Sequence, residues 1–219
     1  MKDEIIRLKN QLDVENKKGI ALDIDETLSF SDNQWFEYML RFNNPEGLSV
    51  EELVKKYKFF EEVPFWQTKE ALDYGQEILH SNEFQEKLPL IENSNHIVNE
   101  INRIVPIVVY ITARPEAVRK GTITWLKKHG FPAADVLMRP LDIDFDFRNI
   151  WKAQILEELY PEISGIVDND PKLADNLSKN YKGILYLYDN HSHQRKDIKI
   201  VPCKTWENVF DKIKLEYIK

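Results

Sequence analysis

Short apolar runs separated by helical stretches are the feature that most restricts the fold of this chain. The runs are rich in Ile, Val, Leu and Tyr, as in VPIVVYIT, and the intervals between them have the length and the terminal Gly or Pro of helices. Strands of this kind form a mostly parallel sheet with helices on both faces, which makes the fold class α/β. The predicted strands are 20–25, 105–112, 135–139, 164–168 and 184–188. The predicted helices are 2–16, 115–129, 149–159 and 171–180.

One long interval, 31–92, does not fit this alternation. It has few β-branched runs and is rich in Glu, Lys, Leu and aromatic residues, which predicts several helices. We therefore expect an α/β core domain formed by residues 1–30 and 93–219, with a small helical domain of residues 31–92 inserted after the first strand.

The composition excludes several classes of protein. With 42% hydrophobic and 31% charged residues, the 219-residue chain is globular, and its net charge of −7 gives no general attraction to nucleic-acid polymers or anionic membranes. The N-terminal segment is too charged for a secretory signal, and no apolar run has the length of a membrane span. The single cysteine, Cys203, fits a reducing compartment. We expect a cytoplasmic protein that does not bind a membrane.

Polar side chains gather where the predicted strands end. Asp23 and Asp25 end the first strand, Thr112 ends the second, and the run 168–170 (DND) ends the fourth. The carboxyl ends of parallel strands meet at one edge of a sheet, where such folds bind their ligands. Two adjacent carboxylates there repel each other unless a cation compensates them, and Mg²⁺ prefers carboxylate oxygens, carbonyls and waters as ligands. The sequence therefore predicts a Mg²⁺ site at this edge.

Four segments together resemble the motifs of the haloacid dehalogenase-like superfamily. They are DIDET at 23–27, ITARPE at 111–116, NIWKAQIL at 149–156 and VDNDP at 167–171. They occur in the order and on the strand ends that this superfamily requires, and they span nearly the whole chain. The resemblance implies a Rossmann-like core and a helical cap of the type inserted after the first strand.

The resemblance also implies a role for each motif residue. Asp23 is expected to attack phosphorus and form an aspartyl phosphate. Asp25 is expected to protonate the leaving alcohol and later to deprotonate the hydrolytic water. Thr27 supports the turn at the substrate site, Thr112 donates a hydrogen bond to the transferring phosphoryl group, and Lys152 neutralises the charge that develops on it.

The metal ligands are expected to come from the first and fourth motifs. Asp23 contributes its carboxylate and Asp25 its backbone carbonyl. In the fourth motif, many members of the superfamily carry two consecutive acids, whereas this chain has Asp168, Asn169 and Asp170. The sequence leaves open whether the amide oxygen of Asn169 or one of the two aspartates binds Mg²⁺.

Substrate choice is expected to depend on the helical insertion and on the second motif. Phe30, Trp35 and Phe36 follow the first motif closely and are candidates for stacking on a base or ring. Arg114 lies in a TARP segment that resembles the second motif of deoxyribonucleotidase-like phosphatases. In this chain, Arg114 is expected to contact phosphate or to pair with an acid of the site. Most aromatic residues of the insertion are expected to form its own core.

The function predicted from these residues is that of a Mg²⁺-dependent phosphomonoesterase. Its substrate is expected to be a small phosphorylated metabolite, with nucleoside monophosphates as one candidate. Asp25 favours phosphate esters, because the dehalogenating branch of the resembling superfamily lacks this acid. The alternatives are a phosphoprotein phosphatase or a phosphomutase with the same intermediate, and a binding or scaffold protein on the same fold. The presence of Asp23, Asp25, Thr112 and Lys152 disfavours a non-catalytic role.

Overall fold

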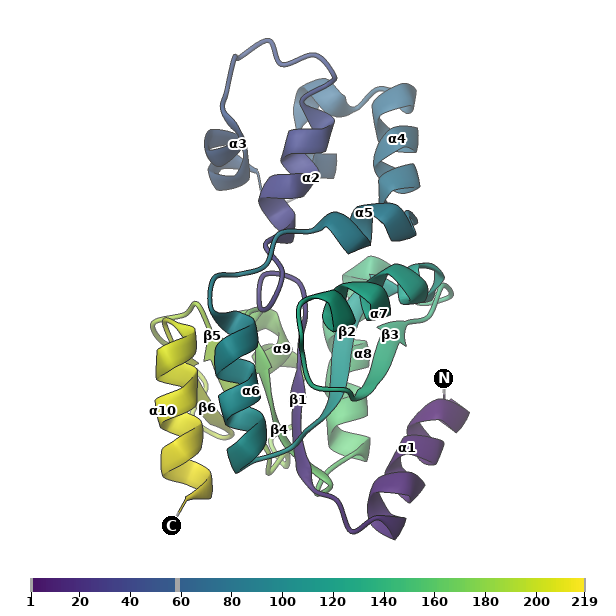
Figure 1. Cartoon of the computed structure of the whole chain (residues 1–219). Helices are drawn as coiled ribbons and strands as arrows, with labels where there is room; N and C mark the ends of the chain where they lie inside the picture. Colours follow the sequence, from purple (N-terminus) through teal and green to yellow (C-terminus); the bar gives the residue numbers. More distant parts are fainter. Residues whose placement is uncertain (1, 58–59, 219) are drawn as a thin grey trace.

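A parallel sheet runs through the centre of the structure (Figure 1). The computed structural model describes residues 2–57 and 60–218, and within them six parallel strands pair in the order β3-β2-β1-β4-β5-β6. The strands are β1 (Gly19–Leu22), β2 (Ile107–Pro115), β3 (Asp135–Arg139), β4 (Ile163–Asp168), β5 (Ile184–Tyr188) and β6 (Lys199–Cys203). The predicted α/β class is confirmed, and β1 lies near the middle of the sheet.

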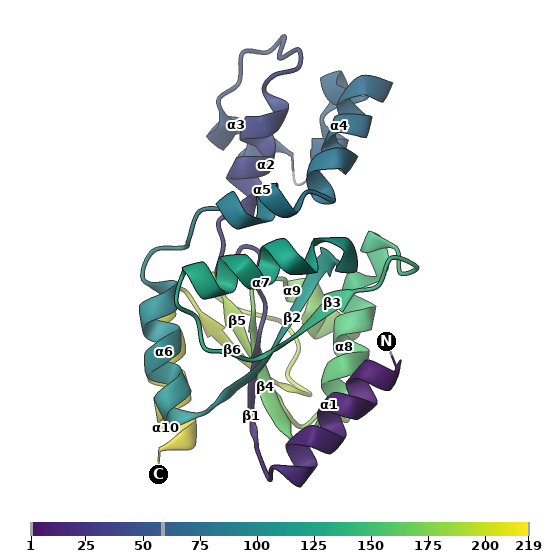
Figure 2. The same ribbon diagram turned by 45° about the vertical axis from the view of Figure 1, so that its right-hand side comes forward.

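Helices cover both faces of the sheet. Figure 2 separates α1 and α8 from α6 and α10 on the opposite side. Successive side chains of a strand point to opposite faces, so Ala21 packs in a buried cluster with residues of α1, α8 and α9, whereas Leu22 packs in a second cluster with residues of α6, α7 and α10. The six helices are α1 (Lys2–Val14), α6 (Ser94–Ile104), α7 (Arg119–Lys128), α8 (Arg148–Glu158), α9 (Pro171–Asn176) and α10 (Trp206–Tyr217).

The strands and helices differ from the sequence prediction at several ends. The first strand stops at Leu22, so Asp23 and Asp25 lie just beyond the sheet, although the backbone N–H of Asp23 still donates to the Val167 carbonyl over 2.9 Å. The sequence analysis omitted β6 and α10. Pro202 inside β6 weakens the strand signal, and the structure places this strand at the edge of the sheet, where a proline is tolerated.

A block of helices between β1 and β2 stands over the carboxyl ends of the strands (Figure 1). Phe36, Leu53 and Trp66 belong to a buried hydrophobic cluster inside the block, whereas Ile78 and Phe84 join a cluster of the sheet. The division of the chain at residues 31 and 92 therefore stays a prediction. The block comprises α2 (Ser31–Met39), α3 (Val50–Lys56), α4 (Lys69–Leu79), α5 (Asn82–Lys87) and the short 3₁₀ turns Phe60–Glu62 and Pro64–Trp66.

Two contacts hold the helical block over the sheet. The chain segments that enter and leave the block run antiparallel, because the Phe30 N–H donates to the Pro89 carbonyl and the Ile91 N–H to the Leu28 carbonyl. Helix α5 lies against α7, where the Gly121 N–H donates to the Asn82 side chain over 2.6 Å. The block is thus fixed directly above the strand ends.

Two further 3₁₀ turns, Glu116–Val118 and Phe145–Phe147, precede α7 and α8. Among the described helices, none has both the length and the apolar character needed to cross a membrane.

Candidate functional site

The centre of the site is a buried triad of two carboxylates and an ammonium group. Asp23 follows β1, Asp168 ends the neighbouring strand β4, and Lys152 projects from the first half of α8. The Lys152 Nζ lies 2.7 Å from Asp23 Oδ1 and 2.8 Å from Asp168 Oδ2, and all three side chains are at most 6% exposed. The repulsion between the strand-end acids is therefore compensated in part by a lysine that lies 129 residues from Asp23 in the sequence.

Burial and charge act in opposite directions on Asp23. The pKa of Asp23 is raised to about 7, because burial and the Asp168 and Asp25 carboxylates together raise it more than the Lys152 ammonium lowers it. Burial lowers the pKa of Lys152, but the two carboxylates outweigh this effect and leave that pKa above its usual value. Lys152 is therefore a permanent cation. The single lysine only partly offsets the burial of the carboxylates, so the triad favours a further cation near Asp23.

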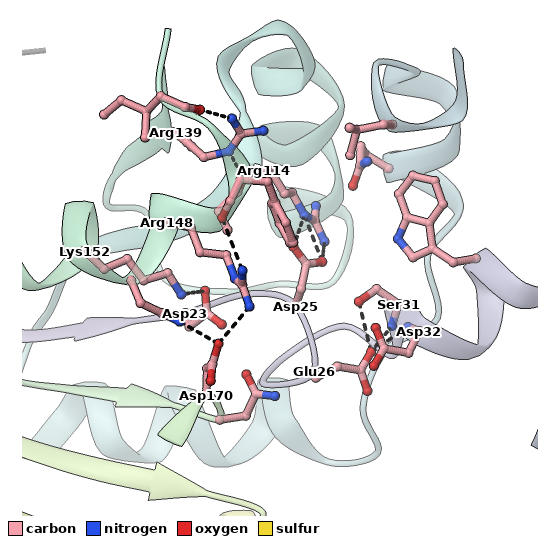
Figure 3. A pocket seen from close by; sticks show the side chains of 18 of the residues that line it. Asp23, Asp25, Glu26, Ser31, Asp32, Arg114, Arg139, Arg148, Lys152 and Asp170 are labelled. Carbon is pink, nitrogen blue, oxygen red and sulfur yellow. Dashed lines mark hydrogen bonds and ion pairs between the residues drawn. The ribbon is translucent and has the colours of Figure 1, made fainter. Parts of the chain in front are cut away.

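Asp25 is held by an arginine of the second motif. The Arg114 guanidinium donates to both carboxylate oxygens of Asp25, with distances of 2.7 to 3.0 Å (Figure 3). The Ser29 hydroxyl donates to the same carboxylate over 3.1 Å. Burial raises the pKa of Asp25, but the charge and hydrogen bonds of Arg114, together with Ser29, outweigh it and lower the pKa below its usual value. Asp25 is thus an ionised carboxylate in this arrangement.

The three residues of the fourth motif differ in what they contact. Asp168 is fully buried, and its second oxygen accepts from the Asp170 backbone N–H over 2.8 Å. Asp170 caps α9 through the Lys172 N–H and accepts from Asn149 and Arg148. These contacts give both aspartates structural roles.

Asn169 has a different position in the fourth motif. Its amide oxygen accepts from the Thr27 hydroxyl over 3.4 Å, and the same hydroxyl lies 3.5 Å from Asp23 Oδ2. One hydroxyl therefore brings an Asn169 oxygen and an Asp23 oxygen into the same neighbourhood. Thr27 is fully buried, and its contacts support the turn.

Mg²⁺ fits this pair of oxygens. Among the described residues, no group of three His, Cys, Asp or Glu side chains forms a ready metal cluster. Mg²⁺ does not need one, because it keeps several waters and is commonly bound by one or two carboxylates. Asp23 Oδ2 and Asn169 Oδ1 are hard oxygen donors on the wall of one cavity, beside an incompletely compensated carboxylate. The donor set therefore suits a hard divalent cation.

Glu26 ties the first motif to the helical block, a role that the sequence analysis missed. Its carboxylate accepts from the backbone N–H groups of Ser31 and Asp32 and from the Ser31 hydroxyl, with distances of 2.6 to 2.9 Å. These donors are at the N-terminus of α2, where an anion is favoured. Glu26 has a φ of +52°, in the left-handed region that favours glycine. The signal in the sequence was an acid that precedes a helix start by five residues.

A cavity of about 560 Å³ opens between the helical block and the sheet. Asp23, Asp25, Arg114, Lys152 and Asn169 all line it, so residues from four separate segments of the chain converge there. The predicted residues Asp170, Trp35 and Phe36 line it as well.

Two predicted substrate contacts are not found on the cavity wall. Phe30, the residue before α2, is 43% exposed and does not line the cavity. Thr112 is fully buried, and its hydroxyl accepts from the Arg114 backbone N–H over 3.2 Å. Neither side chain belongs to the cavity wall, and the contacts of Phe30 with a ring and of Thr112 with a phosphoryl group stay predictions.

The aromatic residues that do line the cavity already pack against other rings. Trp35 stacks on Phe60 with ring centroids 5.7 Å apart and lies 4.6 Å from the ring of Phe84. Phe36 is 1% exposed and contacts Trp66. These rings mainly form the core of the helical block, which leaves little face for stacking on a substrate.

The cavity also contains two arginines that the sequence analysis missed. Arg139 is the last residue of β3, and Arg148 is the first of α8. They flank the ring of Phe145, with guanidinium carbons 5.8 and 4.2 Å from its centroid. Burial lowers the pKa of Arg139, Asp144 raises it, and Arg148 lowers it. The segment 141–147, between β3 and α8, thus also forms part of the cavity wall.

Comparisons with known proteins match solved structures alone. No protein-family model matches the chain, and no curated protein matches it. Among solved structures, a phosphoserine phosphatase from T. onnurineus in complex with NDSB-201 is 17% identical with a TM-score of 0.47, covering 90% of this chain and 94% of that one. A haloacid dehalogenase-like family hydrolase from Xanthomonas campestris is 14% identical with a TM-score of 0.42, covering 92% of this chain and 97% of that one. At these values the function must be argued from the site.

Proposed function

We propose that this protein is a Mg²⁺-dependent phosphomonoesterase of the haloacid dehalogenase-like type. The observation that carries the proposal is the position of Asp23, a carboxylate at the end of β1 that contacts Lys152, lies beside the Asn169 amide and lines the cavity. A nucleophile, a fixed cation and a pair of metal-binding oxygens are the parts that transfer of a phosphoryl group through an aspartyl phosphate requires.

In the proposed reaction, a carboxylate oxygen of Asp23 attacks the phosphorus of a phosphate monoester. The bond from phosphorus to the ester oxygen breaks, and that oxygen leaves as the alcohol after it gains a proton. Water then attacks the aspartyl phosphate and loses a proton, so inorganic phosphate is released and the Asp23 carboxylate is restored. Lys152 stays in contact with Asp23 and stabilises the negative charge that accumulates on the phosphoryl group.

Asp25 is the group that exchanges these protons in our proposal. Its ionised state beside Arg114 suits removal of a proton from the hydrolytic water. Protonation of the leaving alcohol requires Asp25 to carry a proton first, which a weaker contact with Arg114 in the substrate complex allows. Thr112 contributes by fixing the backbone of Arg114.

We propose that Asp23 and Asn169 bind Mg²⁺ through their side chains and Asp25 through its carbonyl. When bound, Mg²⁺ neutralises carboxylate and phosphoryl charge and orients the phosphoryl group for in-line attack. Asn169 is preferred to the neighbouring aspartates because both carboxylate oxygens of Asp168 already accept hydrogen bonds and Asp170 contacts Arg148.

The substrate that we propose is a small phosphorylated metabolite. The cavity of about 560 Å³ lies under the helical block and has the size of a small-molecule site. Nucleoside monophosphates stay on the list of candidates, but the packing of Trp35 and Phe36 against other rings gives base stacking no support.

The test is release of inorganic phosphate from a panel of sugar phosphates, nucleoside monophosphates and small carboxylated phosphate esters. We expect turnover with Mg²⁺ and none with excess chelator. The Asp23→Asn variant keeps the size of the side chain but removes the nucleophile, and we expect its kcat to fall by at least about a thousandfold. Variant Lys69→Met, on an exposed face of α4, is the matched control and keeps full activity.

Equal turnover by the wild type and Asp23→Asn would refute the assignment of the nucleophile. Trapping tests the intermediate: a labelled phosphoryl group that is stable in acid and is recovered on Asp23 after rapid quenching supports the covalent path.

A further inference from the structure

The basic residues of the cavity are not equally compensated. Among the described residues, three of the four Arg and Lys side chains on its wall are paired with carboxylates. Arg114 contacts Asp25, and Arg148 contacts Asp170. Lys152 contacts Asp23 and Asp168. The fourth basic side chain, Arg139, has no carboxylate of the described residues within ion-pair distance.

Arg139 is nevertheless buried and held in place. The residue is 6% exposed, its Nε donates to the Ala113 carbonyl over 3.0 Å, and its Nη1 donates to the Ile143 carbonyl. For the described residues, no acceptor is within hydrogen-bond distance of Nη2. Two backbone carbonyls thus fix the guanidinium and leave further N–H donors available, and Asp144 acts on its charge only from beyond ion-pair distance. An anion that enters the cavity can take these donors.

The place of Arg139 in the sheet separates it from the reacting carboxylate. Arg139 ends β3, which is two strands from β1. Neighbouring strands lie about 4.8 Å apart, so the ends of β3 and β1 are on the order of 10 Å apart. Figure 3 shows Arg139 at the upper part of the cavity and Asp23 lower down, with Arg148 drawn between them. When a phosphoryl group is bound at Asp23, Arg139 can therefore contact another part of the same ligand.

We propose that Arg139 is a second anion subsite that binds a carboxylate or a second phosphate on the leaving-group side of the substrate. The inference rests on the proposed phosphomonoesterase function and deepens it, because it names the substrate class as phosphate monoesters that carry a second, separate anionic group. A guanidinium fixed by backbone carbonyls matches such a group in a bidentate geometry.

The test compares esters that differ in one anionic group. For a carboxylate the pair is 3-phosphoglycerate and glycerol 3-phosphate, and for a phosphate it is 1,3-propanediol bisphosphate and propyl phosphate. The readout is the ratio of kcat/KM within each pair. We expect the wild type to favour the ester with the extra anion by tenfold or more in one pair, mainly through KM. The pair that shows this preference identifies the anion.

Arg139→Gln removes the charge, and we expect the ratio in that variant to fall to about one. Arg139→Lys keeps the positive charge but loses the paired N–H donors of the guanidinium, and it is expected to give an intermediate ratio. Arg103→Gln, an exposed arginine on α6, is the matched control and keeps the wild-type ratio. A wild-type ratio near one in both pairs, or the same ratio in wild type and Arg139→Gln, would overturn the proposal.

A binding experiment separates this inference from the proposed function. Calorimetry with 4-phosphonobutyrate and propylphosphonate, which differ by one carboxylate and are not hydrolysed, needs no turnover. We expect 4-phosphonobutyrate to bind the wild type at least tenfold more tightly, with this preference lost in Arg139→Gln. The preference without any esterase activity supports the subsite and rejects the proposed function. Esterase activity without the preference in either experiment rejects the subsite alone. If Arg139→Gln does not fold, the test compares the preference of Arg139→Lys for the ligand with the extra anion with that of the wild type. The same preference in both proteins, or none in the wild type, then overturns the proposal.

Discussion

Replacement of Lys152 by Met tests the buried triad most directly. Methionine has a similar length but no charge, so the change leaves the carboxylates of Asp23 and Asp168 together in the protein interior. Removal of one partner from a buried ion pair typically costs about 3 to 5 kcal/mol. The full value is expected here, because the three side chains are at most 6% exposed and solvent screens them little.

The expected loss converts into a change of melting temperature. For 219 residues, an unfolding entropy of about 2.1 cal/mol/K per residue gives about 0.46 kcal/mol/K. A loss of about 3 to 5 kcal/mol then lowers Tm by about 7 to 11 °C. The assay is thermal unfolding followed by circular dichroism with chelator present, together with urea unfolding at 25 °C.

A second variant and a control make this experiment specific. The double variant Lys152→Met/Asp168→Asn removes one of the two remaining charges, so we expect it to be more stable than the single variant, with a coupling energy of about 1 kcal/mol or more. Lys69→Met breaks an exposed pair with Asp73 on α4 and is expected to cost less than about 1 kcal/mol. A Tm for Lys152→Met within about 2 °C of the wild type would refute the argument that this charge compensates the strand ends.

Three further predictions concern the helical block and the metal. A Cβ on Gly121 would lie 2.3 Å from the Asn82 carbonyl oxygen, so Gly121→Ala should displace α5. We expect a loss of about 1 to 3 kcal/mol in the free energy of unfolding, reduced by up to about 1 kcal/mol because alanine favours the helix more than glycine. A urea unfolding midpoint above that of the wild type contradicts this. Glu26→Gln weakens the hydrogen bonds to the N-terminus of α2, so amide hydrogen exchange at Ser31 should accelerate about two- to fivefold. An unchanged exchange rate would contradict the role of Glu26 in holding α2. Mg²⁺ should raise the Tm of the wild type, because it binds the folded protein. A tenfold loss of Mg²⁺ affinity in Asn169→Ala would remove about 1.4 kcal/mol of the stabilisation by Mg²⁺. An equal increase of Tm in both proteins excludes Asn169 as a ligand.

The sequence analysis succeeded where the signal was local. The run around Val108 to Thr112 and the run ending at Asp168 were recognised because strand periodicity is carried by neighbouring residues. It failed for β6, where Pro202 obscured an edge strand whose partner β5 supplies the pairing. Element type was thus readable from the chain, while the full extent of the sheet was not.

The candidate site shows the same division. The spacing of Asp23 and Asp25 on the end of an apolar strand gave the position of the chemistry without any structure. The second motif predicted that Arg114 contacts phosphate or pairs with an acid of the site, and in the structure Arg114 pairs with Asp25. Nothing in the sequence indicated that Arg139 would line the same cavity, because it ends a different strand.

By itself, the sequence determined the α/β class, the helical insertion after the first strand and the edge at which acidic groups collect. These properties follow from hydrophobic periodicity and from the rule that parallel strands end on one side. Only the tertiary structure decided that Thr112 is fully buried, that Asn169 lies near Asp23, and that no carboxylate of the described residues lies within ion-pair distance of Arg139. The direction and neutralisation of a side chain depend on groups brought together by folding, which local sequence does not encode.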